Sequence, residues 1–102
     1  MSNVLHLNTE EFLETLKNNE IVFVDFYANW CGPCKMLAPS IDKLADEHPE
    51  VKVVKIDVDK EERLAYEYGV QSIPTLIAFK DGQPVRRQLG FLPYEMLEDM
   101  IK

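Results

Sequence analysis

Residues 21–35 read IVFVDFYANWCGPCK, and this stretch decides the fold. Its first seven residues are apolar apart from Asp25, a pattern that predicts a central β-strand covered on both faces. Its last part contains both cysteines of the chain, Cys31 and Cys34, and its one tryptophan, Trp30. The residues that follow carry apolar side chains at helical spacing. The sequence therefore predicts a cysteine pair at the point where a buried strand turns into a helix.

Length, composition and charge limit the possible classes of protein. The chain has 102 residues and 46% hydrophobic content, which is enough for one domain with its own core, and we expect a single domain over residues 1–102. The net charge of −7 disfavours binding to nucleic acid or to an anionic membrane. No apolar run reaches the roughly 18–20 residues of a membrane span. The first residues also lack the basic and apolar segments of a signal peptide, so we expect a cytoplasmic protein.

Strand and helix patterns alternate along the rest of the chain. The expected strands are 4–7, 21–27, 51–58, 75–80 and 85–90; the expected helices follow Asn8, cover 36–48 and 61–68, and begin at Pro93. The first three strand–helix units predict parallel strands with right-handed crossovers. The last two strands flank Asp81-Gly82-Gln83-Pro84, which is a hairpin signal, and Pro84 suggests an edge strand. The sequence predicts a mixed sheet between helices.

Local residues mark the helix boundaries and the inward faces of the helices. Asn8 with Glu11 three residues later forms a capping-box pattern, and Gly69 suits the position after a helix end. The apolar residues expected to face inward are Phe12, Leu13 and Leu16; Leu37, Ile41, Leu44 and Ala45; Leu64, Ala65 and Tyr68; and Leu97, Met100 and Ile101.

The two cysteines are spaced for reversible dithiol–disulfide chemistry. Disulfide exchange needs a thiolate, and the free N–H groups at a helix start favour negative charge by roughly 0.3–2 kcal/mol. We therefore expect the pKa of the Cys31 thiol to lie below its usual value of about 8.5. Cys31, nearest the helix end, is the expected exposed nucleophile, and Cys34, one turn further in, would resolve the mixed disulfide. Pro33 suits a first helical turn, and Gly32 leaves room for a substrate.

The spacing of the cysteines also permits two other uses. One is a pair of inert buried thiols. The other is half of a zinc site, but zinc needs four ligands and the remaining candidates, His6 and His48, are distant in sequence and poorly spaced. We therefore favour redox chemistry and expect no bound metal.

Asp25 is the second informative residue. A carboxylate is costly to bury in its charged form, so burial in this strand would raise the pKa of Asp25. A buried carboxylate near the cysteines could accept the proton that the resolving thiol loses. Lys55, set in another apolar strand, would lower the pKa again if it approached Asp25. The sequence leaves open the alternative that Asp25 lies at a strand end and reaches solvent.

Together these residues resemble the thioredoxin family over essentially the whole chain. The features that carry the resemblance are Val24-Asp25-Phe26, Trp30-Cys31-Gly32-Pro33-Cys34-Lys35, Pro39, Lys55, Ile73-Pro74-Thr75, the Asp81-Gly82 turn and Gly90. The resemblance implies an α/β fold with a central five-stranded mixed β-sheet flanked by four helices. It also implies that Cys31 is the nucleophile, that Cys34 resolves, and that Asp25 with Lys55 assists proton transfer.

The resemblance further implies a surface on which the substrate chain docks. Ile73–Pro74 would be a cis peptide that lies against the cysteines and presents backbone to the substrate. The positions that match the family's apolar docking surface are Trp30, Gly32, Pro33, Val58, Tyr68, Ile73, Pro74 and Gly90. For Trp30 and Tyr68, the residue type alone favours core filling instead.

Three positions depart from the family pattern. Tyr27 stands where the family usually has tryptophan, Ser72 where glycine is common, and Phe91 where a small residue is usual. We expect Phe91 to enlarge the apolar docking surface if it borders that surface. From the sequence, we expect none of these three residues to affect the sulfur chemistry.

The resulting prediction is a protein disulfide reductase that acts in electron transport and cell redox homeostasis. It would be a monomer without a bound cofactor, recycled by thioredoxin reductase and hence indirectly by NADPH. Oxidases and isomerases of the same fold often have histidine between the cysteines, so Gly32-Pro33 favours reduction. An alternative from another class is a binding subunit that docks a partner around Trp30 without a redox step.

Overall fold

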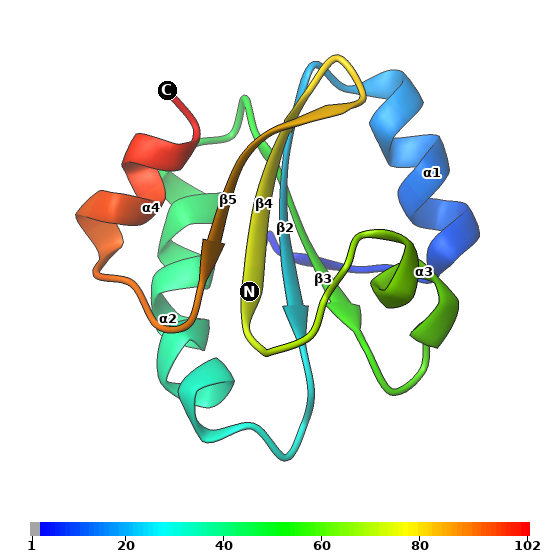
Figure 1. Cartoon of the computed structure of the whole chain (residues 1–102). Helices are drawn as coiled ribbons and strands as arrows, with labels where there is room; N and C mark the ends of the chain where they lie inside the picture. Colours follow the sequence, from blue (N-terminus) through cyan, green and yellow to red (C-terminus); the bar gives the residue numbers. More distant parts are fainter. Residues whose placement is uncertain (1–2) are drawn as a thin grey trace.

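The computed structural model describes residues 3–102 and contains a five-stranded sheet with helices on both faces (Figure 1). In chain order the elements are β1 (Leu5–His6), α1 (Thr9–Asn18), β2 (Ile21–Tyr27), α2 (Gly32–Glu47), β3 (Lys52–Asp57), α3 (Glu62–Glu67), β4 (Thr75–Lys80), β5 (Gln83–Leu89) and α4 (Tyr94–Met100). The strand order is β1-β3-β2-β4-β5. The pairs β1–β3 and β2–β3 are parallel, whereas β2–β4 and β4–β5 are antiparallel. The predicted mixed sheet with four helices is confirmed.

Strand β2 lies at the centre of the sheet, hydrogen-bonded to β3 on one side and β4 on the other. Its residues 22–26 are completely buried. Helices α2 and α4 cover one face of the sheet, and α1 and α3 cover the other (Figure 1). Because successive side chains of a strand point to opposite faces, β2 contributes to two separate cores. The prediction of a strand covered on both faces is confirmed.

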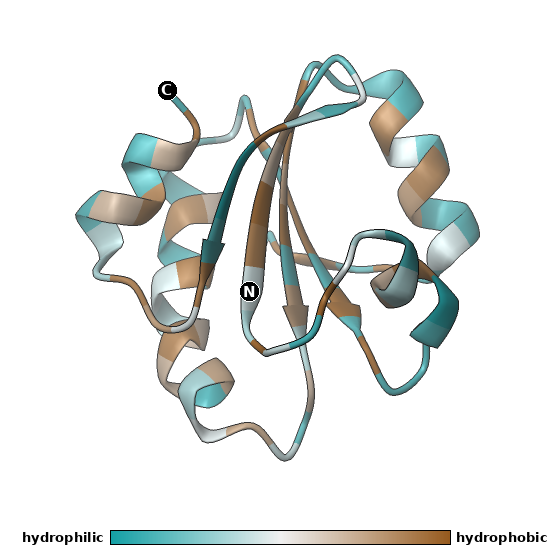
Figure 2. Cartoon of the chain, viewed as in Figure 1, coloured by the Kyte–Doolittle hydropathy of each residue, from teal (hydrophilic) through white to brown (hydrophobic). Residues whose placement is uncertain are grey.

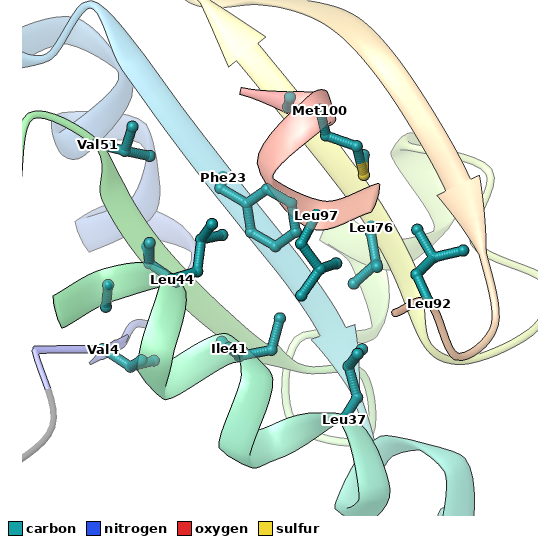
Figure 3. Packing of buried hydrophobic residues seen from close by; sticks show 13 residues of the cluster. Val4, Phe23, Leu37, Ile41, Leu44, Val51, Leu76, Leu92, Leu97 and Met100 are labelled. Carbon is teal, nitrogen blue, oxygen red and sulfur yellow. The ribbon is translucent and has the colours of Figure 1, made fainter. Parts of the chain in front are cut away.

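The two cores divide the buried side chains by face. Phe23 packs with the inward side of α2 and with Leu97 of α4, as Figure 3 shows. Val22, Val24 and Phe26 pack on the other face with residues of α1 and α3. Figure 2 shows β4 as mainly hydrophobic and the edge strand β5 as mainly hydrophilic, which agrees with their burial.

The local boundary signals act as expected. The side chain of Asn8 accepts a hydrogen bond from the Glu11 N–H at 2.9 Å, and the Glu11 side chain accepts one from the Asn8 N–H at 3.0 Å. Gly69 has a φ of +65° after α3. Asp81 and Gly82 both have positive φ in the turn between β4 and β5, as a two-residue hairpin turn requires.

Several expected boundaries were wrong by a few residues. Helix α2 begins at Gly32 rather than at residue 36, because Pro33 fits its first turn and Cys31 caps it. Strand β5 begins at Gln83 because the turn needs only two residues. The strands expected at 4–7 and 51–58 are shorter, at Leu5–His6 and Lys52–Asp57. Leu13 is 46% exposed, since Phe12 and Leu16, one turn apart, already occupy the inward face of α1.

Within residues 3–102, no helix combines the length and apolar character needed to cross a membrane.

The burial of α4 can be tested with two leucines that differ in environment. Leu97 is completely buried in the core between α2 and α4, whereas Leu13 is 46% exposed. We expect Leu97→Ala to lower the free energy of unfolding by roughly 2–5 kcal/mol through lost burial and a cavity. Leu13→Ala, the matched control in α1, should change it by roughly 0.5 kcal/mol or less. Urea unfolding measures both; equal losses would contradict the assignment of α4 to the core.

Candidate active site

Cys31 and Cys34 form a disulfide directly after β2, with their Cα atoms 5.3 Å apart. Cys31 is the residue that caps α2, and its Sγ accepts a hydrogen bond from the Cys34 N–H at 3.2 Å. The first sulfur therefore lies at the positive end of the helix dipole, where a thiolate is stabilised after reduction.

The disulfide packs in a small apolar cluster. Ala28 is buried with the two cysteines, and Tyr27, Val58 and Ile73 pack against them. Cys31 is only 4% exposed and Cys34 is 2% exposed. The expectation that Cys31 is exposed is therefore wrong for the disulfide form, because the neighbouring segments cover its side chain.

A loop before β4 lies against the first sulfur. The Ile73–Pro74 peptide is cis, as the resemblance implied. Cys31 Sγ lies 3.8 Å from the carbonyl oxygen of Ile73. The Gly90 N–H donates a hydrogen bond to the Pro74 carbonyl oxygen at 2.8 Å. Residues 73, 74 and 90 are thus brought together beside the disulfide, although they are distant from it in sequence.

Trp30 projects from the surface next to Cys31. Its side chain is 70% exposed, so core filling is wrong for this residue. The indole Nε1 donates a hydrogen bond to Asp59 Oδ2 at 2.8 Å, which orients the ring. Asp59 was not predicted as a site residue from the sequence. A usable signal was present, because β2 and β3 are parallel neighbours and the segments that follow them share one edge of the sheet.

The remaining predicted docking residues divide into two groups. Gly32, Pro33 and Phe91 are exposed, and Phe91 directly follows Gly90. Tyr68 instead packs on the face of the sheet covered by α1 and α3, with its ring against three phenylalanines. The structure does not bring Tyr68 into the disulfide cluster, and core filling describes it. Met36, which was not among the predicted docking residues, is 67% exposed in the second turn of α2.

Asp25 is completely buried in the middle of β2. Burial raises the pKa of Asp25 from 3.8 to about 7, and the charge of Lys55 partly opposes this rise. Neither carboxyl oxygen has a hydrogen-bond partner among residues 3–102. The alternative of an acid that reaches solvent is therefore wrong.

The direction of the Asp25 side chain follows from strand geometry. Asp25 lies two residues after Phe23, so both point to the face covered by α2. Cys34 and Leu37, about one helical turn apart, are both buried on the inward side of α2. Helix α2 begins shortly after β2 ends, and its buried side, which carries Cys34, covers this face of the sheet. The Asp25 side chain therefore points to the face on which Cys34 lies.

Lys55 of β3 is in register with Asp25 across the parallel strand pair. Its Nζ lies 4.5 Å from the centroid of the Tyr27 ring, over the ring face. No ion pair joins Lys55 to Asp25 in the part of the chain that the structure describes. Across that same part, no group of three or more His, Cys, Asp or Glu side chains is arranged to hold a metal.

Comparisons with known proteins agree with this geometry. The family model described as Thioredoxin matches residues 3–102. The thioredoxin of Haemophilus influenzae is 47% identical, with 99% of this chain and 96% of that protein covered. The thioredoxin of Bacillus subtilis is 44% identical, with 91% and 90% covered.

Solved structures give the same result. A mutant thioredoxin from Halobacterium salinarum superposes with a TM-score of 0.91 at 41% identity, covering 96% of this chain and 87% of that one. The oxidized form of mitochondrial thioredoxin 3 from Saccharomyces cerevisiae has a TM-score of 0.87 at 39% identity, covering 95% and 92%. With its disulfide at the start of α2, the chain belongs to the thioredoxin family and is a thiol–disulfide oxidoreductase that reduces protein disulfides.

Proposed function

We propose that Cys31 begins and Cys34 completes the reduction of a protein disulfide, within a single domain over residues 1–102. The observation that carries this assignment is the position of the Cys31–Cys34 disulfide at the N-terminus of α2. The Cys31 sulfur accepts the Cys34 N–H, so the same helix end would stabilise its thiolate.

The reaction proceeds in two exchanges that balance in atoms and electrons. The Cys31 thiolate attacks one sulfur of the substrate disulfide, which forms a mixed disulfide and releases one substrate thiolate. Cys34 then loses its proton and attacks the Cys31 sulfur, which releases the second substrate thiolate. The substrate gains two electrons, and the protein ends with the Cys31–Cys34 disulfide.

Asp25 is the proposed acceptor of the Cys34 proton. A general base works best when its pKa is close to the ambient pH, and burial brings the pKa of Asp25 to about 7. Its carboxyl oxygens have no other hydrogen-bond partner among the described residues, so they are free to take the proton. Lys55 assists by its charge, which favours the ionised form of Asp25.

The substrate chain is proposed to dock around the disulfide. Pro74 and Gly90 lie in the segment beside Cys31, joined to each other by the Gly90 N–H and the Pro74 carbonyl, and Trp30 and Phe91 add exposed apolar surface. The proposed surface is completed by Gly32, Pro33, Val58 and Ile73. We leave Tyr68 out, since its ring packs in the core under α1 and α3.

The protein must be reduced again after each turnover. We propose that thioredoxin reductase supplies the two electrons, drawn from NADPH, and that the chain acts as a monomeric electron carrier in redox homeostasis. A cytoplasmic location is consistent with this direction, because that compartment keeps protein thiols reduced. The alternative of a redox-independent binding subunit is not favoured, since the paired cysteines and the family both support redox chemistry.

Single cysteine variants test the order of attack. We expect Cys34→Ser to accumulate a mixed disulfide between Cys31 and a peptide disulfide substrate, because the resolving thiol is gone. Cys31→Ser should form no such adduct, and both variants should lose turnover by on the order of 10³-fold or more. Mass spectrometry of the trapped species and a reductase-coupled assay measure these effects. An adduct on Cys34 in the first exchange would reverse the roles of the two cysteines. If the double variant Cys31→Ser/Cys34→Ser still supported the activity of a partner protein, the result would favour the redox-independent binding subunit.

The pH dependence of stability tests the burial of Asp25. The folded pKa is raised, so the neutral carboxyl is the form that the fold prefers. The stability that this group contributes is therefore complete below the unfolded pKa and is lost as pH rises to about 7. We expect Asp25→Asn, in the disulfide form, to be more stable than the parent protein at pH 8 by up to about 4 kcal/mol, with the difference shrinking toward pH 4.

The same variant tests the proton transfer. Asp25→Asn should slow disulfide turnover at neutral pH, because the amide cannot accept the proton. Asp99→Asn, at an exposed acid of α4, is the matched control and should change neither the pH profile of unfolding nor turnover. Urea unfolding between pH 4 and pH 9 and the coupled assay are the measurements. Unchanged turnover in Asp25→Asn would rule out the acceptor role.

Phe91 tests the docking surface. We expect Phe91→Ser to lower kcat/KM for a protein disulfide by roughly 3–10-fold through lost apolar contact, and to leave a small-molecule disulfide unaffected. Val85→Ser is the matched control, because Val85 is similarly exposed but lies toward the opposite end of β5. An equal loss for both disulfides would place the effect of Phe91 on the chemistry instead of on docking.

A further inference from the structure

The Lys55 side chain occupies an unexpected position. Lys55 and Asp25 are paired in register on neighbouring parallel strands, so their side chains leave the sheet on the same face. An ammonium attracts a carboxylate strongly where burial lowers the dielectric. Yet the Lys55 Nζ lies over the Tyr27 ring at 4.5 Å from its centroid, and both carboxyl oxygens of Asp25 are left without a hydrogen-bond partner among the described residues.

Tyr27 is placed to compete for the ammonium. It lies two residues beyond Asp25 on β2, on the same face of the sheet and closer to solvent. The face of an aromatic ring attracts a cation, and the ammonium can keep part of its hydration there. A pocket of about 200 Å³ opens at this point and is lined by Tyr27, Lys55 and His6, among others. The ammonium thus has both the Tyr27 ring and a pocket beside it.

Among the described residues, Lys55 is the cation whose charge acts on the pKa of Asp25, and it is in register with Asp25 across the strand pair. Strand β4 presents an apolar partner, and the inward side of α2 carries no charge near its start. Strand β3 contributes Lys55 and Asp57 to this face, β4 contributes Leu76, and α2 contributes Cys34 and Leu37. On β1, His6 is in register with Lys55, and its ring meets Tyr27 edge-on. The position of one ammonium therefore controls how strongly the ionised carboxyl is stabilised.

We propose that Tyr27 is a positioning residue for the proton transfer: its ring holds the Lys55 ammonium out of ion-pair contact with Asp25, so that the carboxyl can accept a proton near neutral pH. This inference rests on the proposed role of Asp25 and deepens it. Burial and the negative charges of Asp57 and Asp25 raise the pKa of Tyr27, so its phenol stays protonated and the ring stays neutral.

The test is the titration of the Asp25 carboxyl, followed by carbon NMR in the disulfide form, where neither cysteine titrates. Tyr27→Leu and Tyr27→Met each remove the ring and keep apolar volume, so either variant serves if the other does not fold. We expect the Asp25 titration midpoint to fall by roughly one pH unit, because the freed ammonium moves toward the carboxylate. Tyr27→Phe and Tyr27→Trp keep the ring face and should leave the midpoint within about 0.3 pH units of the parent protein.

A double-mutant cycle with Lys55→Met separates positioning from a general structural effect. In the Lys55→Met background, Tyr27→Leu should no longer lower the midpoint, because no ammonium remains to move. An unchanged midpoint in Tyr27→Leu alone, or an equal fall in both backgrounds, would overturn the proposal.

The pH profile of disulfide turnover distinguishes this proposal from the role of Asp25 itself. If Asp25 accepts the proton, the acidic limb of the profile should move with the NMR midpoint in Tyr27→Leu. A midpoint that moves while the profile does not would refute the acceptor role and leave the positioning by Tyr27 intact.

Discussion

The whole structure depends on the burial of β2 on both faces. This strand supplies Phe23 to the core under α2 and α4, and Val22, Val24 and Phe26 to the core under α1 and α3. Strands β3 and β4 both hydrogen-bond to β2, so its backbone groups are paired. Any movement of β2 would therefore disturb both cores. The end of β2 is therefore a rigid point from which the active site can be built.

Three segments converge at that rigid end. The chain leaves β2 at Tyr27 and reaches the disulfide at the start of α2. The segment after β3 brings Asp59 to Trp30, and the loop before β4 brings the Ile73 carbonyl to Cys31. The second and third segments adjoin β3 and β4, which both pair directly with β2. The sulfur chemistry thus takes place on a preorganised framework.

The same burial creates the electrostatic feature of the site. An acid in the middle of β2 loses its hydration, and its pKa rises to about 7. A fully formed ion pair with Lys55 would oppose this effect, but the ammonium lies over the Tyr27 ring instead. The protein consequently retains a destabilising carboxylate at neutral pH, which is the kind of cost that functional sites often carry.

The sequence by itself determined the elements and the identity of the chemical groups. The capping pair Asn8 and Glu11, the turn at Asp81-Gly82 and the apolar run of β2 act through neighbours in the chain, so the order of strands and helices could be predicted within a few residues. Only the tertiary structure decided which side chains meet. Trp30 at the surface on Asp59, Tyr68 in the core and Lys55 on Tyr27 all depend on strand register and sheet face, which bring together residues that are distant in sequence.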